Sequence, residues 1–95
     1  MIRSFADKET ERIFKRERVA RLSTAVQRQA HRKLLLLDAA ETIEDLRTPP
    51  GNRLEELRAG RQGQHSIRVN QRWRICFTWR ADGPHDVEIV DYHRG

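Results

Sequence analysis

The chain lacks the residues on which disulfide-rich, zinc-binding and membrane-spanning proteins depend. Cys76 is the single cysteine among 95 residues, which excludes an internal disulfide and a cysteine-rich zinc site. The only long run of large apolar residues, at positions 34–37, is far too short for a transmembrane helix. The first residues, MIRSFADKE, contain no apolar stretch of the kind found in a secretory signal. These absences predict a protein of the reducing cytoplasm with no membrane association.

Lysine is scarce as well, so arginine dominates the basic residues. Lys8, Lys15 and Lys33 are the only lysines, and 16 of the 19 basic residues are arginines. Guanidinium groups bind phosphate with two parallel hydrogen bonds and stack on bases, although a GC-rich genome produces the same bias. The position of the basic residues along the chain is more informative than their type. Residues 51–80 carry 7 basic and 2 acidic side chains, and this excess of positive charge equals the formal net charge of +5. This concentration of cations indicates a face that binds a polyanion.

The first half of the chain has the spacing of helices. Ser4 or Asp7 can cap a first helix through residues 10–14, and a second helix begins at Ser23. Apolar residues of the second helix fall at helical spacing and form one stripe of Val26, Ala30, Leu34 and Leu37, which Leu35 and Leu36 broaden. So broad a stripe predicts that this helix is covered on more than one side. A short helical turn follows and ends at the PPG sequence of residues 49–51.

After the PPG sequence the period of the apolar residues changes to two, which is typical of strands. The strands are expected at HSIRVN (residues 65–70), RWRICFTWR (72–80) and DVEIVDYH (86–93). Asn70 and Gln71 link the first two in a hairpin without the usual glycine, and ADGPH forms the next turn. In the central strand the inward side chains are Trp73, Ile75, Phe77 and Trp79, and the outward ones are Arg72, Arg74, Cys76, Thr78 and Arg80.

Together these elements predict an α+β fold in one domain over residues 1–95. N-terminal helices pack on one face of a small antiparallel β-sheet, while the other face is open and basic. A chain of this size has no room for a separate cofactor domain, so its site lies on the surface or in a shallow groove. The arginines of the open face would line a surface on which an extended polyanion lies.

Three stretches together form a specific pattern. They are MIRSF at residues 1–5, LLLLDAAETIEDLRTPPGNRLEELRAGRQGQHSIRVNQRWRICFTW at 34–79, and VEIVDYH at 87–93. The combination of PPGNRLE, a basic loop containing glycine, HSIRVN followed by WRICF, and a terminal EIVDYH resembles the HigB toxins, also called plasmid-maintenance killer proteins. These toxins belong to the RelE/ParE toxin superfamily of bacterial toxin–antitoxin operons.

The resemblance implies a RelE-like fold and a toxin of a type II toxin–antitoxin system. Such a toxin is a ribosome-dependent mRNA endonuclease, or mRNA interferase, which cuts codons in the decoding site of the 70S ribosome and inhibits translation and growth. The RNA's own 2′-hydroxyl attacks the neighbouring phosphate, so the implied reaction requires no metal and no other cofactor. The implied partners are mRNA, the ribosome and a HigA-like antitoxin of the helix-turn-helix class, which is expected to bind the helical side.

The same resemblance assigns catalytic roles to the end of the chain. Asp91, Tyr92 and His93 match the functional DYH motif of the family. His93 is the implied proton carrier, since histidine ordinarily titrates near neutrality. Asp91 is either a base or the residue that orients His93. Tyr92 either donates a hydrogen bond to the phosphate or stacks on a base.

Other implied site residues come from the basic middle segment. Arg74 matches the strand arginine that stabilises the transition-state phosphate, and Arg58 and Arg61 match basic residues that contact RNA. Glu55 stands where some relatives carry histidine, and it is either a catalytic base or a solvated charge. Asn70 is a second departure from the family pattern, after Glu55, because some relatives carry arginine at this position. The charge of Arg68 or Arg72 would compensate for the missing cation.

Two functions of other classes stay open at this stage. A ParE-like toxin binds DNA gyrase and needs no proton-transfer residues, so the DYH sequence together with Arg74 favours the nuclease. A non-catalytic RNA-binding module would keep the basic face without the chemistry, and Glu55 in place of histidine is the feature that supports it.

The remaining histidines and the tryptophans have structural interpretations. His31 is expected on the surface of the second helix, His65 at an edge with its side chain inward, and His85 in a turn without a partner. No pair of histidines has the spacing of zinc ligands. Trp73 and Trp79 share the apolar face and are expected in the core.

Overall fold

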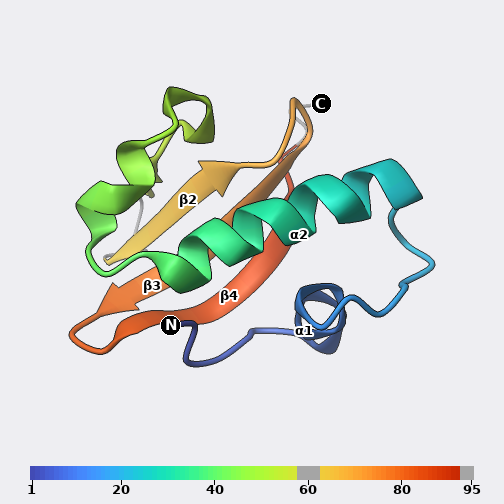
Figure 1. The fold of residues 1–95 in the computed structure, drawn as a ribbon, viewed down its shortest axis with the longest axis horizontal. Coiled ribbons are helices and arrows are strands. Elements are labelled where there is room, and N and C mark those ends of the chain that lie inside the picture. Colours follow the sequence, from blue (N-terminus) through green and yellow to red (C-terminus); the bar gives the residue numbers. More distant parts are fainter. Residues whose placement is uncertain (58–62, 93–95) are drawn as a thin grey trace.

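The computed structural model describes residues 1–57 and 63–92, and a long helix lies across one face of its antiparallel sheet (Figure 1). The helices are α1 (Lys8–Phe14), α2 (Thr24–Ala39) and two 3₁₀ helices, η1 (Ile43–Arg47) and η2 (Pro50–Asn52). The strands are β1 (Glu55–Glu56), β2 (Gln64–Arg68), β3 (Trp73–Arg80) and β4 (Gly83–Asp91), each antiparallel to its neighbour in the order β1-β2-β3-β4. This arrangement confirms the predicted α+β class. None of the helices in the described ranges is long and apolar enough to cross a membrane.

Side-chain caps fix where the two α-helices begin. The carboxylate of Asp7 accepts a hydrogen bond of 2.6 Å from the backbone N–H of Thr10, so Asp7 rather than Ser4 is the cap of α1. The hydroxyl of Ser23 accepts one from the backbone N–H of Val26 at 3.2 Å, as predicted for the second helix. Both contacts satisfy backbone donors that have no partner inside the helix.

The apolar stripe of α2 is narrower than predicted. Ala30, Leu34 and Leu37 are each 0% exposed and pack on the sheet. Leu35 and Leu36, in contrast, are 45% and 38% exposed, so these two leucines do not broaden the buried stripe as predicted. The helix does contact a second element, α1, in addition to the sheet. Consecutive leucines must point in different directions around a helix, and only one of those directions meets the sheet.

The centre of the sheet is an apolar rung that crosses three strands. Ile67 of β2 pairs with Ile75 of β3, which pairs in turn with Ile89 of β4, and all three are 3% exposed or less. Phe77 and Val87 are fully buried beside this rung. The burial of this face against α2 confirms the inward side chains expected for these strands and supplies the main stabilisation of the fold.

Strand boundaries differ from the expected ones at both turns. The connection from β2 to β3 is closed by the side chain of Asn70, which accepts hydrogen bonds from the backbone N–H groups of Arg72 and Trp73 at 2.8 and 2.9 Å. This side-chain turn explains how the hairpin forms without glycine. Strand β4 begins at Gly83, earlier than expected, because the register shift between Cys76 and Thr78 accommodates an extra residue within the strand.

The outward face of β3 is covered where the sequence predicts exposure. Arg74 is 7% exposed and Cys76 is 1% exposed, and Ser66 beside them on β2 is fully buried. The chain after η2 lies on this side, where the backbone carbonyl of Arg53 contacts Arg74. Arg74 is therefore built into the wall of the sheet, unlike the solvent-facing arginine that the alternation predicts.

Candidate functional site

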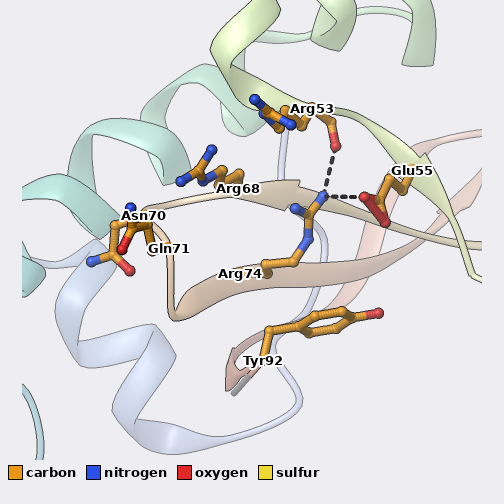
Figure 2. A pocket seen from close by; sticks show the side chains of 7 residues that line it. All are labelled: Arg53, Glu55, Arg68, Asn70, Gln71, Arg74 and Tyr92. Carbon is orange, nitrogen blue, oxygen red and sulfur yellow. Dashed lines mark hydrogen bonds and ion pairs between the residues drawn. The ribbon is translucent and has the colours of Figure 1, made fainter. Parts of the chain in front are cut away.

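A hollow of about 370 Å³ opens on the arginine-bearing face of the sheet (Figure 2). Its walls come from the residue after η2, the start of β1, the β2–β3 hairpin, the start of β3 and the residue after β4. The lining side chains are Arg53, Glu55, Arg68, Asn70, Gln71, Arg74 and Tyr92. Three cations and one carboxylate around a shallow opening form a site suited to a phosphate group.

Arg74 is the most constrained cation of this hollow. Its Nε donates to the hydroxyl of Ser66 at 2.8 Å, and its Nη2 donates to the carbonyl oxygens of Arg53 at 2.6 Å and of Ser66 at 3.4 Å. Among residues 1–57 and 63–92, no hydrogen bond of Arg74 uses Nη1. Three oxygen acceptors thus fix the guanidinium plane and satisfy its buried donors, which lets a charged group sit in the wall.

Tyr92 and Glu55 both lie next to this guanidinium; in Figure 2 the Glu55 carboxylate is beside it and the Tyr92 ring is below it. The guanidinium carbon of Arg74 lies 5.5 Å from the centre of the Tyr92 ring, within the range of a cation–π contact. One carboxylate oxygen of Glu55 lies 3.9 Å from Nη2 of Arg74, and the Glu55 side chain is 54% exposed. So long and exposed an ion pair contributes little to stability and leaves the carboxylate accessible to a ligand.

Asp91 and Arg72 pair with each other outside the hollow. Both Nε and Nη2 of Arg72 donate to one carboxylate oxygen of Asp91, at 2.9 and 2.8 Å. The hydrogen bond to Asp91 raises the pKa of Arg72, and the nearby negative charge adds to the effect. The Arg72 guanidinium also lies over the ring of Trp73, 5.2 Å from its centre. The structure therefore does not bring these two predicted site residues to the hollow.

The predicted site residues thus fall into three groups. The hollow brings together Glu55, Arg68, Arg74 and Tyr92. The Asp91–Arg72 pair lies beside it. The remaining three, Arg58, Arg61 and His93, lie outside the described residues.

Sequence reasoning missed Arg53 and Gln71 as lining residues. Arg53 belongs to the PPGNRLE stretch and lies two residues before Glu55. A cation so close in sequence to the candidate carboxylate was the available signal that Arg53 lines the same site. Asn70 lines the hollow with its turn: its amide Nδ2 donates to Gln29 at 3.1 Å while its oxygen closes the hairpin. Asn70 is therefore a structural residue, and Arg68 supplies the cation beside it.

The other histidines take part in local contacts. The ring nitrogens of His31 contact the carbonyl of Ile13 at 3.0 Å and the guanidinium of Arg16 at 3.2 Å, so this residue links the two helices and is half-buried. His65 stacks on Phe77 and faces inward as predicted, but it does not lie at an edge, because β2 pairs with β1 on one side and with β3 on the other. His85 has a partner after all, a carboxylate oxygen of Asp82 at 2.6 Å. In the part of the chain that the structure describes, no cluster of three metal-ligating side chains occurs.

Comparison with known proteins agrees with this architecture. The sequence model of a family described as the RelE-like toxin of the type II toxin–antitoxin system HigB matches residues 3–93. Toxin HigB-1 of Vibrio cholerae serotype O1 is 39% identical over 95 residues, which cover 99% of both chains. An uncharacterised protein of Haemophilus influenzae is 44% identical over 48 residues, which cover 50% of this chain and 48% of that protein. The chain therefore belongs to the HigB-like family of RelE-like toxins of type II toxin–antitoxin systems.

Proposed function

We propose that this toxin is an endoribonuclease that cleaves mRNA codons in the decoding site of the ribosome and binds the scissile phosphate in the hollow of Figure 2. The observation that carries the proposal is the convergence of Arg53, Arg68 and Arg74 on one opening that also holds the carboxylate of Glu55. A phosphate that gains charge in a transition state needs fixed cations, and a hydroxyl nucleophile needs a base.

The proposed reaction is an internal transfer within the RNA. The 2′-oxygen forms a bond to the adjacent phosphorus while the bond from phosphorus to the 5′-oxygen breaks. A base takes the proton of the 2′-hydroxyl, and an acid gives a proton to the departing 5′-oxygen. The products are a 2′,3′-cyclic phosphate and a 5′-hydroxyl, so the scheme balances without a metal ion or another reactant.

Arg74 is proposed to stabilise the doubly charged phosphorane. Its guanidinium is already held by Ser66 and by the carbonyl of Arg53, so little reorganisation is needed when the charge develops. Arg68 and Arg53 contribute their charges from the rim of the hollow. A buried and fixed arginine is better suited to this role than a mobile surface arginine, because its charge is already oriented before the reaction.

Glu55 is proposed as the base and His93 as the acid. The carboxylate of Glu55 is exposed in the hollow and held only loosely, 3.9 Å from Arg74. Tyr92 presents its ring to the same space, where it is suited to stack on a base or to donate a hydrogen bond to the phosphate. The role of His93 rests on its match to the DYH motif. Asp91, which Arg72 binds with two hydrogen bonds, is proposed to orient the end of the chain rather than to take a proton.

Membership in a type II system implies a cognate antitoxin. We propose that it is a HigA-like protein of the helix-turn-helix class, and that the ribosome supplies the mRNA in the geometry required for in-line attack. The net charge of +5 supports binding to ribosomal RNA and messenger RNA alike.

A growth assay tests the proposed chemistry in cells. Induction of the wild-type chain should stop growth, whereas Arg74→Ala and His93→Ala should each restore it while the variants still bind the antitoxin. Lys8→Ala, an exposed substitution on α1 away from the hollow, is the matched control and should stay toxic. Full toxicity of both site variants would contradict the assignment, and it would favour gyrase inhibition if the topology of plasmid DNA changed on induction.

A further inference from the structure

The carbonyl oxygen that holds Nη2 of Arg74 belongs to an irregular segment, the 50–53 turn, which comprises η2 and Arg53. Two of the three acceptors of Arg74 come from Ser66, whose position is fixed by its pairing with Glu55 and Cys76 in the sheet. The third acceptor, the Arg53 carbonyl, comes from outside any strand, at 2.6 Å. Its placement therefore depends on whatever fixes the 50–53 turn.

Asn52 anchors this turn from inside the protein. Its side chain is fully buried and donates through Nδ2 to the carbonyls of Leu46 at 3.1 Å and Thr48 at 3.3 Å. Its oxygen accepts a hydrogen bond from the ammonium of Lys33 on α2 at 2.5 Å. The buried amide thus uses both of its protons and its oxygen to tie η1, the segment after it and α2 to one point.

Arg53 then adopts a backbone conformation that few residues other than glycine adopt. Its φ of 45° and ψ of 58° lie in the left-handed region, and its N–H donates to the carbonyl of Pro50 at 3.1 Å. This reversal directs the carbonyl of Arg53 at Arg74, as the dashed line in Figure 2 indicates. The Arg53 side chain is exposed, so no packing of that side chain requires the left-handed conformation.

We propose that Asn52 and the left-handed backbone of Arg53 are positioning elements that hold the Arg74 guanidinium in its productive orientation, with Lys33 fixing Asn52. None of these groups needs to touch the reacting atoms for this effect. The proposal rests on the proposed ribonuclease function, because it assigns the 50–53 turn a contribution to the chemical step rather than to RNA binding.

The test compares two variants at one position, Arg53→Gly and Arg53→Val. Both lack the cation, and position 53 is exposed, so neither creates a cavity or a clash in the core. Glycine adopts the left-handed region freely, whereas a β-branched residue is strained there. Single-turnover cleavage on mRNA-programmed ribosomes should be about fivefold to thirtyfold slower for Arg53→Val than for Arg53→Gly, which corresponds to the usual cost of that conformation. The apparent Kd for the ribosome should be the same for the two variants.

Equal rates for the two variants would overturn the proposal, and so would a rate difference that is matched by a difference in Kd. A second pair of variants tests the contact of Lys33 with Asn52. Lys33 lies outside the hollow, and Lys33→Met removes its hydrogen bond to Asn52. Arg32→Met, at an exposed neighbouring position on α2, is the control. We expect a lower rate constant with unchanged Kd for Lys33→Met, and no change for Arg32→Met. A wild-type rate for Lys33→Met would remove Lys33 from the mechanism.

An NMR measurement separates failure of this inference from failure of the nuclease proposal. The Nε–H signal of Arg74 reports its hydrogen bond to Ser66 without any substrate. In Arg53→Val and Lys33→Met this signal should move and exchange faster with water, whereas in Arg53→Gly it should stay near its wild-type position. An inactive wild-type chain with this pattern would support positioning and overturn the nuclease. If the wild-type chain is active and the Arg74 signal is the same in all three variants as in the wild type, the positioning role is overturned and the nuclease proposal is not.

Discussion

Replacing Arg74 by lysine keeps a positive charge in the wall of the hollow but removes its fixed shape. A lysine ammonium is a single nitrogen on a flexible stem, so it cannot reach the Ser66 hydroxyl and the Arg53 carbonyl as the guanidinium does, at 2.8 and 2.6 Å from Nε and Nη2. At least one buried acceptor loses a charge-assisted hydrogen bond, which is worth about 1.5–3 kcal/mol. We therefore expect the free energy of unfolding of Arg74→Lys to fall by about 2 kcal/mol.

Urea unfolding followed by tryptophan fluorescence measures this loss, since the chain contains Trp73 and Trp79 in or beside the core. With a slope of about 2 kcal/mol per molar urea, the midpoint should fall by roughly 1 M. Arg80→Lys makes the same chemical change at an exposed position of the same strand and should leave the midpoint unchanged.

The effect on cleavage should exceed the effect on folding. Loss of one preorganised donor to a developing negative charge typically costs about 100-fold or more in kcat. Single-turnover cleavage by Arg74→Lys, measured where the variant is fully folded, should show a loss of that size with little change in affinity for the ribosome. A rate within about threefold of wild type, roughly 0.7 kcal/mol, would refute the reasoning, because charge alone would then suffice.

Three further variants test other parts of the account. Glu55→Gln should lower kcat by about 100-fold to 10,000-fold as expected for loss of a general base, while Glu56→Gln in the same strand, outside the hollow, should cleave normally in the same single-turnover assay. Asn52→Leu leaves the carbonyls of Leu46 and Thr48 and the ammonium of Lys33 without these hydrogen bonds, and urea unfolding should show a free energy of unfolding lower by at least about 3 kcal/mol, at about 1 kcal/mol or more for each of the three groups. The hydrogen bond from His85 lowers the pKa of Asp82 below its usual 3.8, so Asp82 stabilises the fold above about pH 4 and loses this effect as the pH falls through the lowered pKa. Melting temperatures of wild type and Asp82→Asn should therefore differ at pH 6 and converge in acid, and a constant difference would contradict this.

Local patterns predicted the elements of this fold because they reflect local physics. The cap at Ser23 and a strand along residues 72–80 are visible in the sequence, and the structure contains that cap and a strand over Trp73–Arg80. The two-residue strand β1 was not predicted, because its existence depends on pairing with β2, which no local pattern records. Likewise, strict alternation placed Arg74 in solvent, whereas a segment about 20 residues earlier covers it.

The candidate site was predictable in residue type more than in arrangement. Resemblance to a family pointed to Arg74, Glu55 and Tyr92, and the structure brings these three together. It also pointed to Asp91 and Arg72, whose mutual hydrogen bonds satisfy the two charges beside the hollow. Whether two opposite charges bind each other or a ligand is decided by distances in the folded chain, so the sequence could not separate these cases.

The central claim is that the toxin cleaves mRNA on the ribosome by chemistry that depends on the hollow. Primer extension on a defined mRNA in a purified translation system, with and without ribosomes, tests it most directly when wild type, Arg74→Lys and Glu55→Gln are compared. The account predicts cuts in phase with codons for wild type, only in the presence of ribosomes, and at least about a 100-fold lower rate for both variants. Intact mRNA with a wild-type chain that still stops growth, or unchanged cleavage by both variants, would contradict it.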